Sequence, residues 1–186
     1  MRARFTTTLG MIVRDDRFEE DLGVISGILI HPDNGIVEGF FVENVGFFQH
    51  ATLFLSAMDI VHFGSRIRIK NADSLAPVED LIRVQRVLEE GRTILGQRMM
   101  TQSGQYLGRC KDVQFETKTF QTEWYFPKKF LRWGVPVPRS AILEVKQDVI
   151  VVRDLILPVS DSDTAAESLL RPLETLVSPP VSRVRE

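Results

Sequence analysis

The fold is decided by residues 95–119, LGQRMMTQSGQYLGRCKDVQFETKT, because a degenerate copy of this stretch occupies residues 9–34. A Leu-Gly pair opens each copy, a polar turn follows, and a second Leu-Gly pair closes the turn. The corresponding leucines are Leu9 and Leu95 (95 − 9 = 86), then Leu22 and Leu107 (107 − 22 = 85). The first copy therefore has one extra residue, in the charged turn 15–21. Self-similarity at a nearly constant offset indicates duplicated units.

After the second Leu-Gly pair, both copies place apolar residues at a spacing of three and then two. These residues are Ile25, Ile28 and Ile30 in the first copy, and Cys110, Val113 and Phe115 in the second. Side chains of a regular strand alternate in twos, so a step of three predicts a β-bulge. The expected positions are Ser26–Gly27 and Lys111–Asp112.

The similarity continues to the end of each unit. Phe40–Phe41 aligns with Tyr125–Phe126, Ser56–Ala57 with Ser140–Ala141, Val61 with Val145, and Ile67–Ile69 with Ile150–Val152. The last two apolar runs of each unit flank a short turn, which predicts a terminal hairpin. In the first unit we also expect strands at residues 7–13, 24–30 and 36–42. Each unit is predicted to be a small all-β domain.

In the first unit this order of features resembles the PRC-barrel domain. The matching features are the two Leu-Gly pairs, the bulged strand, the HPDNG turn at 31–35, the aromatic strand, SAMDIV at 56–61 and the closing hairpin. The family includes the cytoplasmic part of the photosynthetic reaction-centre H subunit and the C-terminal domain of a bacterial 16S rRNA-processing and ribosome-maturation factor. The resemblance covers residues 5–71 and 93–154. It implies small, strongly bent β-barrels that act as docking modules without catalytic residues.

The predicted architecture is mainly β, with two tandem PRC-type barrels joined by one α-helix and a largely disordered C-terminal tail. The boundaries are residues 1–72 for the first barrel, 73–92 for the linker helix, 93–155 for the second barrel and 156–186 for the flexible tail. Proline and Ser-Asp repeats in the tail favour disorder, and a short leucine-rich segment within it either folds back or binds a partner.

Residues near both ends of the linker segment favour a helix. Pro77 and the acids after it are typical of a helix start, and Gly91 is typical of a helix end. The apolar stripe contains Leu81, Val84, Val87 and Leu88. We expect this stripe to pack in the crease between the two barrels.

Composition and charge limit the function. The net charge of −2 and the isoelectric point of about 6.0 do not fit a protein that coats nucleic acid over its whole surface. The only cysteine, Cys110, excludes an intramolecular disulfide and fits a reducing compartment. No apolar run is long enough to span a membrane and no signal-peptide core is visible. A cytoplasmic location is therefore expected.

The sequence contains no recognisable catalytic or metal-binding motif. His31, His50 and His62 lack metal-ligand spacing, and no nucleophile elbow, phosphate-binding loop or dinucleotide motif occurs. Cys110 occupies an apolar strand position, which indicates a small core residue. We therefore predict no catalytic, cofactor-binding or metal site.

The most distinctive candidate surface is residues 123–139, EWYFPKKFLRWGVPVPR, where aromatic and basic residues interleave. The candidate interaction residues are Trp124, Lys128, Lys129, Phe130, Arg132, Trp133 and Arg139. In one interpretation the aromatics belong to the barrel core and the cations form a solvated rim. In the other, exposed aromatics and cations contact nucleobases and phosphates or an anionic lipid surface. The corresponding loop of the first unit carries Phe47 and Phe48, which would point to opposite faces of a strand.

These observations favour a non-catalytic scaffold that binds a protein partner through its barrel surfaces or tail. One alternative is an RNA- or ribosome-associated assembly factor that uses residues 124–139. Another is a peripheral component of a photosynthetic or other membrane complex, by analogy with the family. The oligomeric state is left open.

Overall fold

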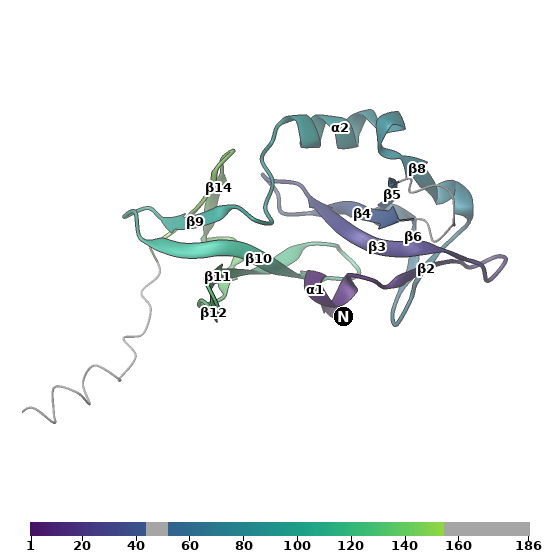
Figure 1. Cartoon of the computed structure of the whole chain (residues 1–186), viewed down its shortest axis with the longest axis horizontal. Coiled ribbons are helices and arrows are strands. Elements are labelled where there is room, and N and C mark those ends of the chain that lie inside the picture. Colours follow the sequence, from purple (N-terminus) through teal and green to yellow (C-terminus); the bar gives the residue numbers. More distant parts are fainter. Residues whose placement is uncertain (44–51, 155–186) are drawn as a thin grey trace, which may run out of the picture. The chain divides into compact units, whose positions relative to one another are not determined.

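A computed structural model of the chain describes residues 1–43 and 52–154. The chain is mainly β, with two sheets, one of which forms a half-barrel. In Figure 1 the strands of the first repeat are purple to blue, and those of the second are teal to yellow-green. The expectations for Phe47 and Phe48, for His50 and for the tail 156–186 lie outside the described residues.

The first sheet contains seven strands, all from the first repeat and the segment that follows it. Their order is β6-β7-β2-β3-β4-β5-β8. The strands are β2 (Ile12–Asp15), β3 (Asp21–Ile30), β4 (Val37–Glu43), β5 (Thr52–Ser56), β6 (Ile60–Phe63), β7 (Ile67–Ile69) and β8 (Leu75–Pro77). Short 3-10 turns at Ala57–Asp59, Ala72–Ser74 and Val78–Asp80 connect the later strands and lead into the helix.

The second sheet has eight strands, with the central order β12-β11-β10-β9-β15-β14. Seven of them are β9 (Arg98–Thr101), β10 (Tyr106–Glu116), β11 (Thr122–Lys129), β12 (Arg132–Trp133), β13 (Val137–Pro138), β14 (Ile142–Val145) and β15 (Val149–Val152). A 3-10 turn at Arg139–Ala141 precedes β14. The eighth strand, β1 (Arg2–Arg4), comes from the other end of the chain and pairs with β10.

The predicted duplication is confirmed by the strand register. The β3–β4 ladder shifts between Ile25 and Gly27, and the β10–β11 ladder shifts between Cys110 and Asp112. Both bulges therefore lie where the spacing of three predicted them. Each repeat also ends in an antiparallel hairpin, β6–β7 or β14–β15, whose second strand pairs in parallel with the first strand of the same repeat.

The two Leu-Gly pairs have different physical roles. In the first pair, Gly10 and Gly96 have φ values of 76° and 86°, in the left-handed region that glycine adopts without strain. In the second pair, a Cβ on Gly23 would lie 2.5 Å from the carbonyl oxygen of Glu43, and a Cβ on Gly108 would lie 2.8 Å from that of Lys128. Neither site has room for a side chain, because a neighbouring strand passes directly over it.

The two repeats meet through equivalent turns, in a pseudo-twofold arrangement. The Val37 N–H donates to the Phe120 carbonyl at 2.8 Å, and the Thr122 N–H donates to the Gly35 carbonyl at 3.0 Å. These four positions correspond at one offset (120 − 35 = 122 − 37 = 85), so the two bonds are reciprocal. Ile36 and Gln121, which form an isolated β-bridge, are related by the same offset. The axis of the pseudo-twofold relation between the two repeats therefore passes through this bridge. Such reciprocity is the geometry of an isologous dimer interface.

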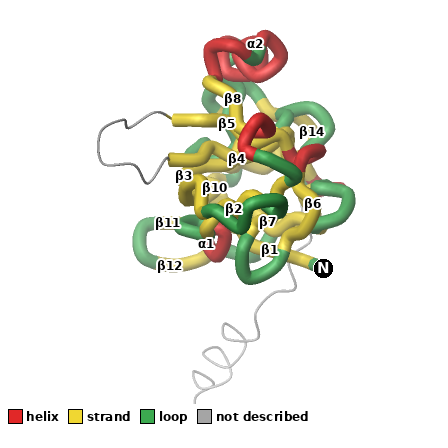
Figure 2. The backbone as a smooth tube through the Cα atoms, turned by 90° about the vertical axis from the view of Figure 1, so that its right-hand side faces the viewer, coloured by secondary structure: helices red, strands yellow, loops and turns green. Residues whose placement is uncertain are grey.

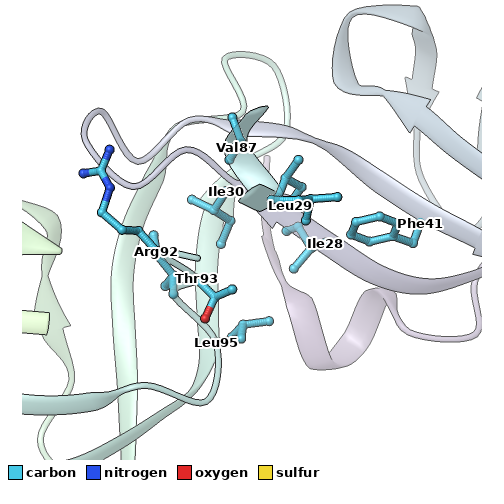
Figure 3. A pocket seen from close by; sticks show the side chains of 10 residues that line it. Ile28, Leu29, Ile30, Phe41, Val87, Arg92, Thr93 and Leu95 are labelled. Atoms are coloured by element: carbon cyan, nitrogen blue, oxygen red, sulfur yellow. The ribbon is translucent and has the colours of Figure 1, made fainter. Parts of the chain in front are cut away.

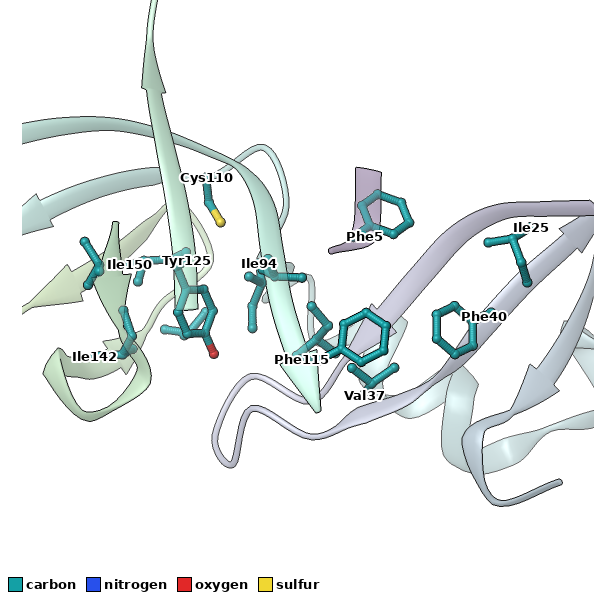
Figure 4. Packing of buried hydrophobic residues seen from close by; sticks show 14 of the residues in the cluster. Phe5, Ile25, Val37, Phe40, Ile94, Cys110, Phe115, Tyr125, Ile142 and Ile150 are labelled. Atoms are coloured by element: carbon teal, nitrogen blue, oxygen red, sulfur yellow. The ribbon is translucent and has the colours of Figure 1, made fainter. Parts of the chain in front are cut away.

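A single buried cluster joins the two sheets. Phe40 of β4 lies 5.9 Å from Phe115 of β10, measured between ring centroids, and Phe63 of β6 lies 5.8 Å from Phe115. Figure 4 shows Val37 and Phe40 facing Phe115, with Tyr125 and Ile150 further into the second sheet. The described residues, 1–43 and 52–154, accordingly belong to one compact unit.

Two expectations about the connecting segments are wrong. Residues 7–11 are not part of a strand, because Phe5–Thr8 form a helical turn, α1, in which the Thr8 hydroxyl donates to the Phe5 carbonyl. The linker helix α2 (Ile82–Glu89) does not pack in a crease between barrels. Its buried Val84 and Val87 pack against Leu29 and Phe54 of the first sheet. Figures 1 and 2 show α2 lying over this sheet, close to β8 and β5.

Both corrections have the same cause. The segment before each repeat crosses to the other repeat: β1 pairs with residues 114–116 of β10, and α2 packs near Leu29 of β3. These contact positions are equivalent in the two repeats. At this position α2 packs on the first sheet through its side chains, whereas β1 joins the second sheet through backbone hydrogen bonds.

The proposed alignment of Val61 with Val145 is also wrong. In the terminal hairpins Val145 pairs with Ile150, whereas Phe63 pairs with Ile67. Phe63 is thus the counterpart of Val145, at an offset of 145 − 63 = 82. The shorter offset shows that the first repeat has extra residues between its aromatic strand and its hairpin.

Within residues 1–43 and 52–154, the first and last strands in the order of each sheet are not hydrogen-bonded to each other. Closure of each repeat into a barrel and the division into domains at residues 72 and 93 remain predictions.

Burial of Cys110 gives a testable result. The side chain has no exposed surface, and desolvation raises the pKa of the thiol to about 12. At pH 8 only about one thiol in ten thousand would be ionised. We expect the native protein not to react with a thiol-specific dye within minutes, and to react fully in denaturant. A Ser65→Cys variant, with a second thiol in an exposed turn, should react at once with one equivalent. Rapid labelling of native Cys110 would contradict the packing described.

Candidate interaction surface on the second sheet

The candidate residues lie mainly on the β11–β12 hairpin. Lys128 pairs with Trp133 and Lys129 with Arg132, so Phe130 and Leu131 form a two-residue turn. We call Phe130 and Leu131 the hairpin tip. Phe130 is 92% exposed and Leu131 is 76% exposed, the largest exposed fractions of any apolar side chains on this hairpin.

The backbone at the tip is unusual. Phe130 has a φ of 54°, in the left-handed region that bulky residues rarely adopt. The first position of a two-residue hairpin turn with positive φ is normally glycine. A phenylalanine there costs conformational energy and contributes no burial to the described fold.

Strand alternation separates the rest of the segment into two faces. Tyr125 points inward, is fully buried, and shares a hydrogen bond of 2.8 Å with the Thr122 hydroxyl. Trp124 and Trp133 are partly exposed, Trp133 by 51%. The interpretation that the aromatics belong to the core thus holds for Tyr125 and fails for both tryptophans.

Cations lie over the exposed rings. The Arg4 guanidinium carbon lies 4.0 Å from the ring centroid of Phe126 and 5.7 Å from that of Trp133. The Lys128 Nζ lies 5.2 Å from the Trp133 ring on the same hairpin. Such contacts hold the rings and cations together as an ordered surface. We call Arg4, Trp124, Phe126, Lys128 and Trp133 the aromatic face.

A row of cations crosses the sheet beside this face. Arg98 on β9 is directly opposite Arg109 on β10, and Arg109 is directly opposite Lys128 on β11. Opposed residues of antiparallel strands point to the same side, and like charges in that position destabilise the pairing. One NH of Arg109 donates to the Gly96 carbonyl at 2.8 Å, which fixes its side chain without neutralising its charge.

The acids on these strands do not neutralise the row. Asp112 pairs with Arg4 at 2.7 Å, Glu123 with Arg2 at 2.6 Å, and Glu116 with the Met1 ammonium at 2.9 Å. All three acids are thus held by the N-terminal segment. Several cations around the hairpin form no ion pair with another described residue, among them Arg98, Arg109, Lys128, Lys129 and Arg132. The outer side of the second sheet is therefore locally positive, although the whole chain is slightly acidic.

Arg139 does not belong to this surface. Its guanidinium donates to the Asp33 carbonyl at 2.7 Å, where the turns of the two repeats meet. The structure instead adds Arg4, Arg98 and Arg109 to the candidate set. No local sequence pattern points to these three residues, because only the strand register brings them beside the hairpin.

Two hollows elsewhere are less suited to binding. A cavity of about 180 Å³ lies between α2, β3 and the segment leading to the second repeat, with Leu29, Phe41 and Val87 in its wall. It is smaller than the roughly 300 Å³ of the smallest usual ligand pockets. In Figure 3 the Arg92 side chain extends away from the apolar wall, and it pairs with Asp33. A polar hollow near His62 contains Arg14 and Arg68, which pair with Asp21 and Asp16.

Two further observations bear on function. The part of the chain that the structure describes contains no group of three or more His, Cys, Asp or Glu side chains placed to hold a metal ion. Across the same residues, no helix has the length and apolar character needed to cross a membrane. No model of a known protein family matches the chain, and comparison with curated proteins yields no significant match.

Proposed function

We propose that this chain is a non-catalytic docking protein that binds a protein partner through the aromatic face. Its two repeats would be tandem PRC-type barrels joined by α2, with the second barrel as the binding module. The observation that carries the proposal is the pair of partly exposed tryptophans with ordered cations between and beside them. Tryptophan and arginine are the residue types most enriched at the energetic centres of protein interfaces.

The other aromatic rings of the sheet support this assignment. Tyr125 fills the core from the same strand, so Trp124 is not needed to cover it. Trp133 is held on a two-residue strand by backbone pairing with Lys128 and by Arg4. A rigid aromatic side chain that is already oriented loses little entropy on binding. This is the behaviour expected of an interface anchor.

An RNA- or ribosome-associated role is the second candidate, and the unpaired cation row favours it. Arg98, Arg109 and Lys128 could follow a phosphate backbone while the tryptophans stack on bases. Binding of that kind would weaken steeply with salt and would disappear after nuclease treatment. A protein interface centred on the tryptophans would depend on salt much less.

Capture of binding partners by the tagged full-length chain tests the proposal. With nuclease present, the wild type is expected to retain a specific protein, and Trp124→Ala/Trp133→Ala to weaken its binding at least thirtyfold, a loss of about 2 kcal/mol. A matched control, Phe18→Ala, removes an exposed aromatic from the turn between β2 and β3 and should bind normally. The affinity is then measured with the purified partner. Equal binding by the double variant would exclude the aromatic face, and loss of all retained material with nuclease would favour RNA.

A further inference from the structure

We propose that the hairpin tip inserts into an anionic lipid bilayer, with the neighbouring cations at the level of the lipid head groups. The inference rests on the proposed docking role, because it identifies the surface at which a docked partner would be held. The inserted residues are Phe130 and Leu131 at the turn, and Lys128 and Trp133 are the members of the aromatic face nearest to them.

The first argument is the exposure of the tip. Phe130 is 92% exposed and Leu131 is 76% exposed, so most of each side chain is in contact with water. Contiguous exposed apolar side chains on a soluble fold mark contacts with proteins or membranes. These residues stand at the end of a hairpin, and a convex apolar protrusion fits a deformable lipid surface.

The second argument is that the turn retains phenylalanine where the backbone favours glycine. The φ of 54° at Phe130 is unfavourable for a bulky side chain. Glycine would relieve the strain and remove an exposed ring, so the ring has no visible role in the folded state alone. Inserted into a bilayer, it would gain a favourable environment.

The third argument is the position of the charges. Lys129 and Arg132 form the first pair behind the tip, and Lys128 and Trp133 form the second. At about 3.3 Å per residue along a strand, these pairs lie roughly 3 and 7 Å behind the turn. An interfacial segment buries its apolar part by about 5–10 Å. With Phe130 and Leu131 among the acyl chains, the cations and Trp133 therefore reach the head-group layer, where tryptophan and basic residues are favoured.

The positive charge around the hairpin tip favours lipids with anionic head groups. No acidic residue occurs between Glu123 and Glu144, although the whole chain has a net charge of −2. The cations Arg98 and Arg109 extend the positive surface across two further strands. A nucleic acid would use the same cations but would gain nothing from Leu131, which has no ring to stack on a base. The composition of the tip thus favours lipid.

Co-sedimentation of the full-length protein with vesicles tests the inference. We expect binding to phosphatidylcholine vesicles that contain about one third phosphatidylserine, and at least tenfold weaker binding to phosphatidylcholine alone. Phe130→Ser/Leu131→Ser and, separately, Lys129→Glu/Arg132→Glu should each reduce binding to the anionic vesicles at least tenfold. Equal binding to both kinds of vesicle, or unchanged binding by the tip variant, would overturn the inference.

The matched control variants change residues outside the hairpin, in the first repeat and in the turn between β10 and β11. Met58→Ser/Val61→Ser removes another exposed apolar pair, with Met58 89% and Val61 58% exposed. Lys70→Glu/Lys118→Glu makes the same change of charge away from the hairpin. Both should sediment like the wild type. Equal loss in a control and its matched hairpin variant would show that binding is not specific to the hairpin.

The two tryptophans provide a direct readout, because both lie on this surface and the chain has no others. In Trp124→Phe, the emission of Trp133 should shift to shorter wavelength on addition of anionic vesicles, and lipids brominated on the acyl chain should quench it. Unshifted, unquenched emission at saturating lipid would overturn the inference. Absence of vesicle binding while a protein partner is still captured through the aromatic face would remove the lipid contact and leave the docking function intact.

Discussion

Replacing Phe115 by alanine is expected to lower the free energy of unfolding by about 4 kcal/mol. Phe115 has no exposed surface. Its ring packs against Phe40 and Phe63 of the first sheet and against Phe120 of the second, at centroid distances of 5.8–6.4 Å. The cavity left by alanine would lie where the two sheets meet, so neither repeat could close it alone. Urea denaturation followed by circular dichroism measures the loss.

The same contact predicts that the two repeats unfold together. Both tryptophans lie in the second sheet, so their fluorescence reports on that sheet. Phe40→Ala alters only the first sheet, yet it should lower the tryptophan-detected midpoint together with the midpoint detected by circular dichroism. Phe18→Ala, at an exposed position, should change the stability by less than about 0.5 kcal/mol. A tryptophan transition that is unaffected by Phe40→Ala would show that the repeats are energetically independent.

The sequence predicted the internal structure of each repeat because the deciding features are local. A Leu-Gly pair at a left-handed turn and a step of three before a bulge each concern a few neighbouring residues. Duplication doubled every such signal, and the glycines at positions 23 and 108 then proved to be sites of close strand approach. Two expectations within the first repeat were wrong: the strand of residues 7–13 begins only at Ile12, and the alignment of Val61 with Val145 fails because insertions changed the offset.

The relations between the repeats could not be predicted in this way. Where β1 crosses to β10, Asp112 accepts hydrogen bonds from Arg4 and Thr6. The counterpart of Asp112 in the first repeat is Gly27, and a difference at one position leaves no periodic pattern in the sequence. Helix α2 was placed wrongly because its amphipathic pattern shows which face is buried and not which sheet covers it. The reciprocal turn contacts also needed the three-dimensional arrangement of both repeats.

The candidate surface was predicted in part. The interleaved aromatics and cations of residues 124–133 identified the hairpin, and strand alternation explains why Tyr125 is buried beside an exposed Trp124. Arg139 was included because it is close in sequence, but a 3-10 turn carries it to the junction of the repeats. Arg98 and Arg109 were missed because cross-strand neighbours are separated in the chain.

Asp112→Ala should be the most disruptive single change outside the aromatic cluster. The Asp112 carboxylate is fully buried. It accepts hydrogen bonds from the Arg4 side chain at 2.7 Å, from the Thr6 N–H at 3.0 Å and hydroxyl at 2.7 Å, and from the Val113 N–H at 2.9 Å. Alanine would leave several of these donors without a partner. A loss of about 3 kcal/mol is expected from removing one member of a buried, hydrogen-bonded charge network.

In the Asp112→Ala variant, the N-terminal segment should be the first part of the fold to lose its structure. Three of the four donors to Asp112 lie in this segment. Hydrogen exchange is expected to accelerate first in residues 2–8, and trypsin should cleave after Arg4 in the variant before it cleaves the rest of the fold. Glu123→Gln is the matched control, because it removes only the exposed Arg2 ion pair and should cost no more than about 0.5 kcal/mol.

Release of the segment would also withdraw Arg4 from the rings of Phe126 and Trp133, so partner capture should weaken in the same variant at temperatures where the rest of the protein is folded. Unchanged protection of residues 2–8 in Asp112→Ala would show that pairing with β10 alone holds β1, and that the buried carboxylate is not what fixes the aromatic face.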